Sequence, residues 1–205
     1  MASSSPHSAG RNMSSRIPAD KPTLDWDKLS RLVHYICDEA PNPKRLGATR
    51  LNKILYYSDF EAYLQLGAPI TGEVYVKQKH GPVPKHVLTV LDRLKENEAI
   101  AIAEASGYFA YTGEPSYAPR LFYSLRRPDI HDFLPDEIRI VDEVIRVICL
   151  EYTATSIRKL SHDVIWKAAE IGEEIPYFTV FAQLLGDIDA DDITWARETI
   201  ASRTK

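Results

Sequence analysis

The sequence predicts an α+β fold: a mainly α-helical single domain with a small antiparallel β-sheet. Apolar residues recur at helical spacing in several long segments, and short β-prone runs separated by Gly, Ser and Pro occupy residues 99–127. The chain has 205 residues, of which 44% are hydrophobic, and this suits one sizeable core better than two. We therefore expect one folded domain over residues 23–205, ending in a C-terminal helix, after a disordered tail at residues 1–22.

The composition argues against several classes of protein. The formal net charge of −4 gives no overall attraction to nucleic acid, and no helix-turn-helix pattern stands out, so DNA binding is not predicted. No apolar run reaches the ~18 residues of a membrane span, and the N-terminal segment has no apolar signal-peptide core. The two cysteines lie in apolar helical patterns and do not suggest a disulfide framework. We expect a cytoplasmic protein that does not bind a membrane.

The N-terminal part of the chain divides into the tail and a first helix. Residues 1–22 are rich in Ser, Pro, Ala and Gly, so burial could not offset the entropy lost on ordering them. In the run LDWDKLSRLVHYICDEA, residues 24–40, apolar side chains recur at helical spacing. The PNPK sequence that follows ends this helix, because proline cannot continue it.

Residues 47–95 predict a helix, a strand and a further helix. The run GATRLNKILYYSDFEAYLQLG, residues 47–67, has Thr49 as its expected N-cap and Gly67 as its expected stop. Its apolar residues spread around much of the circumference, which predicts that this helix is the central one. Residues 73–79 alternate in polarity, as in a half-buried strand that HGPVP then breaks, and residues 85–95 again show helical spacing.

The remaining elements follow from β-prone and helical runs. AIAIAE, YFAYTG and LFYSL predict two or three strands of a small antiparallel sheet, which residues 73–79 could join. Residues 134–152 predict a helix with one apolar stripe, and Thr155 is the expected cap of a short helix that ends near His162. In DIDADDITWARETIASR, residues 187–203, acidic residues precede arginine, the order that the helix dipole favours.

The stretch KHGPVPK, residues 79–85, predicts a shaped turn between strand and helix. Gly81 can adopt a positive φ, and Pro82 fixes φ near −65°. The alternative is that His80 and His86 are metal ligands or acid–base groups. No CxxC, HExxH or clustered carboxylate accompanies them, so we predict no metal site, no cofactor and no catalytic residue.

Three separated motifs carry a family resemblance. They are the helical run LNKILYYSDF, which begins at Leu51, the GPV turn at residues 81–83, and a late LSH sequence from Leu160 that is followed by Trp166. In this order they resemble the Panacea domain, also called the SocA-like antitoxin domain, a phage-associated family formerly catalogued as a domain of unknown function. The resemblance spans roughly residues 24–181, essentially the whole folded part.

The resemblance implies a non-enzymatic antitoxin from a bacterial or prophage two-gene module, which binds the toxin encoded by the adjacent gene. The family pairs one type of domain with many toxin classes, including alarmone-synthetase-like, Fic-type and translation-targeting toxins. One member is instead an adaptor that delivers its toxin to a ClpXP-type protease, so such a protease is an alternative partner. A shared fold does not decide between these partners and routes.

The motifs also supply candidate toxin-binding residues. These are Lys53, Tyr56, Tyr57, Lys79, His80, Gly81, Pro82, Val83, His162 and Trp166. For Lys53 the favoured interpretation is structural, with a buried stem and an ammonium group that reaches solvent. Tyr56 and Tyr57 point in different directions on a helix, so at most one shares a given core face. His162 and Trp166 lie one helical turn apart, and a structural contact between their rings is favoured over a binding site.

Two further interpretations concern charge and catalysis. The basic residues in LRRPD and KQKHGPVPKH could form a modest face toward an acidic toxin surface or nucleic acid, although exposed turns also carry such charges to stay soluble. Ser161, His162 and Asp163 are adjacent on a helix and point apart, so they cannot form a hydrolase relay.

The rival hypothesis is a small enzyme that uses His80 or His162 as a general base. It requires a partner group within hydrogen-bond reach of the histidine in a concave pocket.

Overall fold

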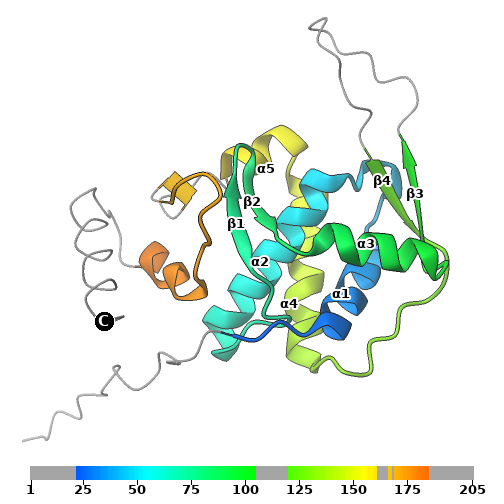
Figure 1. Ribbon diagram of the computed structural model, residues 1–205, viewed down its shortest axis with the longest axis horizontal. Helices are drawn as coiled ribbons and strands as arrows, with labels where there is room; N and C mark the ends of the chain where they lie inside the picture. Colours follow the sequence, from blue (N-terminus) through cyan, green and yellow to red (C-terminus); the bar gives the residue numbers. More distant parts are fainter. Residues whose placement is uncertain (1–21, 105–119, 161–165, 168, 185–205) are drawn as a thin grey trace, which may run out of the picture.

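The computed structural model describes residues 22–104, 120–160, 166–167 and 169–184. The prediction of an α+β, mainly helical fold with antiparallel strands is confirmed (Figure 1). The elements are α1 (Trp26–Glu39), η2 (Pro43–Arg45), α2 (Ala48–Leu66), β1 (Tyr75–Gln78), β2 (Gly81–Pro84), α3 (Val87–Glu96), β3 (Ile100–Glu104), β4 (Arg120–Ser124), α4 (Pro135–Arg146), η3 (Val147–Glu151), α5 (Ala154–Leu160) and η4 (Tyr177–Leu184). The predicted tail, apart from Pro22, and the helix predicted for residues 187–203 lie outside the described residues.

The ends of α1 and α2 have local causes. The side chain of Asp25 caps α1 by accepting a hydrogen bond from the backbone nitrogen of Lys28 at 2.9 Å. Gly67 adopts the left-handed conformation, with φ of 83°, and ends α2 as predicted. The prediction that Thr49 caps α2 is wrong, because the helix begins earlier and Gly47 occupies the N-cap position.

The helix α2 lies at the centre of the fold, as the spread of its apolar residues predicted. It contacts α1, α4, α5 and β2, and Figure 1 shows these elements around it. Its buried residues include four with polar or charged side chains, Arg50, Lys53, Ser58 and Asp59. Arg50, Lys53 and Asp59 make hydrogen bonds to residues outside the helix, so α2 contributes polar contacts as well as apolar packing.

The strands predicted within residues 99–127 form one of two separate antiparallel sheets. In this sheet β3 pairs with β4, with Ile100 opposite Ser124 at one end and Glu104 opposite Arg120 at the other. The run YFAYTG, which was a candidate strand, lies outside the described residues. Residues 73–79 do not join this sheet.

The second sheet is the hairpin of β1 and β2, and it corrects the prediction that HGPVP only breaks a strand. Tyr75 lies opposite Pro84, and Gln78 lies opposite Gly81, so the proline-containing segment is itself a strand. On the other side of β1, the segment 172–175 runs alongside, with hydrogen bonds between backbone groups such as that from Ile175 to the Tyr75 oxygen at 2.7 Å. The strand β1 is therefore flanked on both sides.

The helix predicted over residues 134–152 is present over residues 135–151, but it changes from an α-helix to a π-helix. The α-helical part, α4, ends at Arg146, η3 is a π-helix, and Tyr152 is already extended. The cap of α5 is Thr153, whose hydroxyl oxygen accepts a hydrogen bond from the backbone nitrogen of Ser156 at 3.0 Å, so the prediction of Thr155 was wrong. Because Tyr152 leaves the helix, Thr153 is the residue from which α5 can begin.

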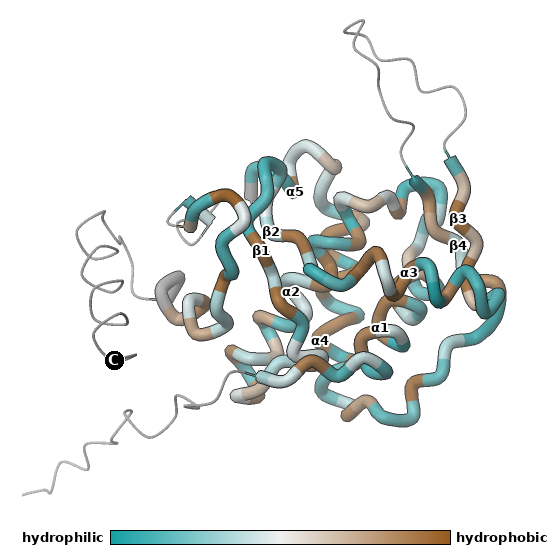
Figure 2. The backbone as a smooth tube through the Cα atoms, viewed as in Figure 1, coloured by the Kyte–Doolittle hydropathy of each residue, from teal (hydrophilic) through white to brown (hydrophobic). Residues whose placement is uncertain are grey.

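The hydrophobic core draws on several helices and both sheets. Its fully buried members include Leu29, Leu32, Ile36, Leu46, Leu51, Ile54, Leu55, Ile100 and Phe122. The connection from β4 to α4 runs along the outside of the molecule and is mostly hydrophilic (Figure 2). Within the part of the chain that the structure describes, no helix combines the length and the apolar character needed to cross a bilayer.

Candidate functional site

The β1–β2 hairpin carries half of the residues that the sequence marks as candidates. Because Gln78 pairs with Gly81, only Lys79 and His80 form the turn, and both side chains are exposed. Gly81 has a φ of 104°, which confirms the expected positive φ. The predicted turn therefore exists, but it is confined to the first two residues of the predicted stretch 79–85, and it joins two strands rather than a strand and a helix.

The prolines of β2 have a specific place in the hydrogen-bond ladder. Lys85 donates its backbone N–H to the oxygen of Val74 at 2.9 Å, and hydrogen-bonded pairs alternate along an antiparallel ladder. Val83, two residues earlier, is therefore in a hydrogen-bonded pair, whereas the backbone groups of Pro82 and Pro84 face away from β1. Proline has no N–H, so this outer edge of β2 offers no backbone donor at those two positions.

Lys53 connects the central helix to this edge. Its ammonium group donates a hydrogen bond to the carbonyl oxygen of Pro82 at 3.0 Å, and the side chain is only 1% exposed. The expectation that its charged end reaches solvent is wrong, because the outward carbonyl of Pro82 needs a donor and Lys53 supplies one inside the protein. Two of the motifs that were separate in the sequence are thus in direct contact.

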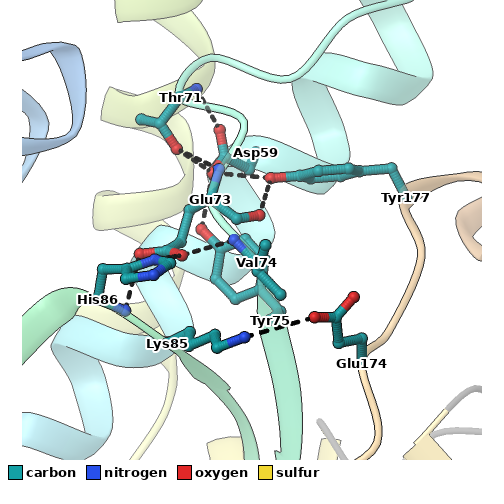
Figure 3. Close-up of polar contacts among 9 residues, drawn as sticks. All are labelled: Asp59, Thr71, Glu73, Val74, Tyr75, Lys85, His86, Glu174 and Tyr177. Atoms are coloured by element: carbon teal, nitrogen blue, oxygen red, sulfur yellow. Dashed lines mark hydrogen bonds and ion pairs between the residues drawn. The ribbon is translucent and has the colours of Figure 1, made fainter. Parts of the chain in front are cut away.

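A buried carboxylate on α2 organises the other end of the hairpin (Figure 3). Asp59 is fully buried and accepts hydrogen bonds from the Thr71 nitrogen at 2.8 Å, the Thr71 hydroxyl at 2.6 Å and the Tyr75 hydroxyl at 2.7 Å. The Tyr177 hydroxyl lies 3.4 Å from the same carboxylate and donates to the backbone oxygen of Glu73 at 2.5 Å. Asp59 therefore joins α2, β1 and η4.

The protonation of Asp59 is shifted by its surroundings. Burial raises the pKa of Asp59 from 3.8 to about 6, because the interior disfavours the charged form. Hydrogen bonds from Thr71 and Tyr75 oppose this rise in the pKa, and the nearby charge of Glu73 adds to it. The stability of the fold consequently depends on pH through this side chain.

Glu73 links the hairpin to α3 through a second buried carboxylate. Its side chain is fully buried and accepts hydrogen bonds from the Nδ1 of His86 at 2.8 Å, the backbone nitrogen of His86 at 3.1 Å and that of Val74 at 2.5 Å. The His86 ring meets the Trp26 ring edge-on, with centroids 4.9 Å apart, and the guanidinium of Arg93 lies over the same indole. This arrangement fastens α3 to the hairpin and to α1.

The exposed turn of the hairpin is cationic. The pKa of His80 is lowered by partial burial and by the positive charges of Arg158, Lys79 and Lys53. In the described part of the chain no carboxylate accepts a hydrogen bond from His80. Among the described residues, His80 therefore has no carboxylate that would orient it as a general base.

Trp166 brings the third motif to the same hairpin. Its indole nitrogen donates a hydrogen bond to the Gln78 oxygen at 3.1 Å. The ammonium group of Lys77 lies 4.1 Å from the centre of the Trp166 ring and donates to the Ala169 oxygen at 2.8 Å. His162 lies outside the described residues, so its expected contact with Trp166 stays a prediction.

The two motif tyrosines have different surroundings. Tyr56 is 1% exposed and meets the Tyr75 ring edge-on, with centroids 5.4 Å apart, so it belongs to the core. Tyr57 is half-buried and lines a groove of about 220 Å³ between α2 and α4. Of the pair, Tyr57 alone is placed to touch another molecule.

The polar residues of this site form hydrogen bonds that hold the structural elements together. The described residues contain no group of His, Cys, Asp and Glu side chains arranged to hold a metal ion. The Glu73–His86 contact has the geometry of a carboxylate that orients an imidazole, and sequence reasoning missed both Glu73 and Asp59. In the sequence, the only indication of a role for Glu73 and Asp59 was that each is an acidic residue within a mostly apolar segment. His86 packs against Trp26 and does not line the groove between α2 and α4, so the Glu73–His86 pair holds structural elements together.

The comparisons with known proteins identify the family. A family model described as the antitoxin SocA-like, Panacea domain matches residues 51–167, more than half of the chain. No curated protein and no solved structure gives a match. The matched segment begins in α2, includes the hairpin and ends just after Trp166, so it contains the Lys53–Pro82 and Trp166–Gln78 contacts. Trp26, Ala169 and Tyr177 lie outside it. The chain therefore belongs to the SocA-like Panacea domain family of antitoxins.

Proposed function

We propose that this protein is an antitoxin that neutralises a cognate toxin, encoded by an adjacent gene, through direct protein–protein binding. The observation that carries the proposal is the family match over residues 51–167. Binding would cover the toxin's active site or block substrate entry, through an interface of roughly 800 Å² per partner. The proposal places both proteins in the bacterial cytoplasm and their genes in one bacterial or prophage module.

The placement of the motif residues supports a binding protein rather than an enzyme. Lys53, Tyr56 and Pro82 are buried and hold the hairpin on α2, whereas Lys79 and His80 are exposed at its tip. A scaffold of this kind fixes the shape of a surface without requiring a reactive group. The residues that determine which toxin is bound would then lie on the surface around the hairpin.

The experiment that tests the proposal is co-expression of this chain with the product of the neighbouring reading frame. Growth is scored first, and the complex is then purified through a tag on one partner. Rescue of growth together with a co-purifying complex supports a binding antitoxin. Absence of both a complex and rescue would refute the proposal.

The same experiment separates two other mechanisms. For a proteolytic adaptor, toxin abundance falls when the antitoxin is present and recovers in a strain that lacks the ClpXP-type protease. For an enzyme, a folded variant with His80→Asn and His162→Asn loses neutralisation. We expect constant toxin abundance and full neutralisation by the double variant, because direct binding needs neither degradation nor a general base.

A further inference from the structure

A groove beside the hairpin is the most distinctive surface that the contacts above leave unexplained. It has a volume of about 280 Å³ and lies between the first turn of α2, the hairpin, α3 and β4, elements that Figure 1 shows next to one another. We call it the hairpin groove. The lining residues that bear on its chemistry are Val76, Val83, Lys85, Leu88 and Arg120.

The hairpin groove is apolar and partly open to solvent. Val76 and Val83 are opposite each other in the β1–β2 ladder and both line the groove, so this pair forms an apolar part of its wall. The side chain of Leu88, on α3, lines this groove and is 61% exposed to solvent. An exposed leucine at an apolar groove is a feature of surfaces that contact another protein.

The charged residues of the hairpin groove have one sign. They are Lys85 and Arg120, both exposed, and no carboxylate is among the lining residues. The ammonium group of Lys85 lies 3.6 Å from a carboxylate oxygen of Glu174, at a site where both side chains are about half exposed. Such an exposed pair is worth little, so Lys85 can exchange this partner for another acidic group. In a chain with a net charge of −4, this cationic rim favours an acidic partner.

The backbone beside the hairpin groove argues against an added strand. A strand that extends a sheet needs outward N–H groups on the edge it joins, and Pro82 and Pro84 have none. The carbonyl oxygen of Pro82 is also already bonded to Lys53. A helix satisfies its own backbone hydrogen bonds and can dock through side chains alone, so it is the element that suits this surface.

The lining of the hairpin groove favours apolar side chains of a partner protein over a small molecule. Pockets that bind small molecules usually hold about 300–1,000 Å³ and combine apolar walls with a few converging polar groups. The hairpin groove falls just below that range, and the uncharged polar side chains in its lining are those of Asn52 and Gln78. Its size suits a few apolar side chains that project from a helix.

We propose that the hairpin groove receives an amphipathic, acidic helix of the cognate toxin. The helix inserts apolar side chains beside Leu88 and Val83 and places carboxylates against Lys85 and Arg120. This inference rests on the proposed function and specifies where on the chain the toxin binds and by which chemistry.

The test compares dissociation constants for the toxin, separated from its co-purified complex, with matched variants of the full chain. Leu88→Glu puts a negative charge into the groove, and we expect binding at least about tenfold weaker. The double variant Lys85→Glu, Arg120→Glu reverses the rim, and we expect roughly tenfold weaker binding and a smaller loss of affinity when salt is added. Leu150→Glu is the control, because Leu150 is 64% exposed and lies outside the groove.

The outcomes distinguish the two proposals. Tight binding by wild type and Leu150→Glu, with loss in both groove variants at unchanged melting temperature, supports the hairpin groove as the toxin site. Equal binding by all variants overturns the groove while leaving the antitoxin function intact. The groove is also overturned if Leu88→Glu converts a dimer of this chain into a monomer without weakening toxin binding. If wild type binds no neighbouring gene product, the proposed function fails, and the inference fails with it.

Discussion

The ammonium group of Lys53 lies 3.0 Å from the carbonyl oxygen of Pro82, and this buried contact fastens the hairpin to the central helix. The outer edge of β2 has no N–H to leave unpaired at Pro82 or Pro84, and the carbonyl of Pro82 receives its hydrogen bond from Lys53. Buried backbone groups must be paired. The prolines of GPVP remove two backbone donors, and Lys53 of α2 pairs the carbonyl of Pro82.

The first prediction concerns Lys53. Lys53→Met keeps a long unbranched side chain but removes the donor to Pro82. We expect the free energy of unfolding to fall by about 1–3 kcal/mol, because a buried carbonyl loses a hydrogen bond. Urea denaturation followed by circular dichroism measures this loss.

The matched control for that prediction is Lys79→Met at the exposed hairpin turn. A surface change of this kind should alter the free energy of unfolding by no more than about 0.5 kcal/mol. If Lys53→Met equals Lys79→Met in stability, and the amide protons of Gly81 and Val83 exchange at wild-type rates, then the Lys53 contact does not hold the hairpin.

The second prediction is a pH dependence caused by Asp59. Its pKa is raised from 3.8 to about 6 in the folded chain, so between about pH 4 and pH 6 the folded chain keeps a proton that the unfolded chain has released. The contribution of Asp59 to the free energy of unfolding therefore falls as pH rises through this window, by roughly 3 kcal/mol in total. The loss is complete above the folded-state pKa.

Asp59→Asn isolates this effect, because the amide does not titrate while every other carboxyl group stays the same. The variant should be least stable relative to wild type at pH 4 and should gain on wild type as pH rises to 7. Paired urea titrations at pH 4, 5, 6 and 7 measure the difference. A difference that does not change with pH would show that the pKa of Asp59 is ordinary in the folded protein.

The helices were predictable from sequence because their causes are local. The helical spacing of apolar residues and the positive φ available to Gly67 act within a few residues, and both predictions were confirmed. The predicted N-caps were less accurate. Thr49 and Thr155 are of a type that often caps helices, but α2 and α5 each begin one residue before them, at Ala48 and Ala154. A cap depends on where the chain leaves the helix, which packing also decides.

The polar interior could not be predicted for a different reason. Asp59 and Tyr177 are 118 residues apart in sequence, and Lys53 and Pro82 are 29 apart, so no local pattern reveals their contacts. The sequence also does not show that Pro82 and Pro84 leave the outer edge of β2 without donors. This follows only from the β1–β2 register, which turns the backbone groups of both prolines away from β1. The hairpin groove was missed because it combines residues from five elements, α2, β1, β2, α3 and β4, and none of these elements indicates a groove by its own sequence.

The third prediction concerns the contact between Glu73 and His86. His86→Ala leaves the buried carboxylate with backbone donors only, and we expect the free energy of unfolding to fall by about 1.5–3 kcal/mol. Glu73→Gln should cost less in the His86→Ala background than in wild type, because the two residues interact directly, with a coupling energy of about 1–3 kcal/mol. A double-mutant cycle measures this coupling. Additive effects would mean that the contact contributes nothing to stability.

The fourth prediction compares two glycines that share a left-handed backbone but differ in surroundings. Gly67 and Gly72 have φ of 83° and 67°, so alanine at either position costs about 1–2 kcal/mol of backbone strain. A Cβ at Gly67 meets nothing within 4 Å, whereas a Cβ at Gly72 would overlap the backbone oxygen of Thr23, which cannot rotate away. Gly72→Ala should therefore destabilise the fold by about 1–3 kcal/mol more than Gly67→Ala in thermal unfolding. Equal losses would mean that the chain before α1 moves freely away from Gly72, contrary to the hydrogen bond of 2.8 Å that ties Asp25 to the Thr71 oxygen.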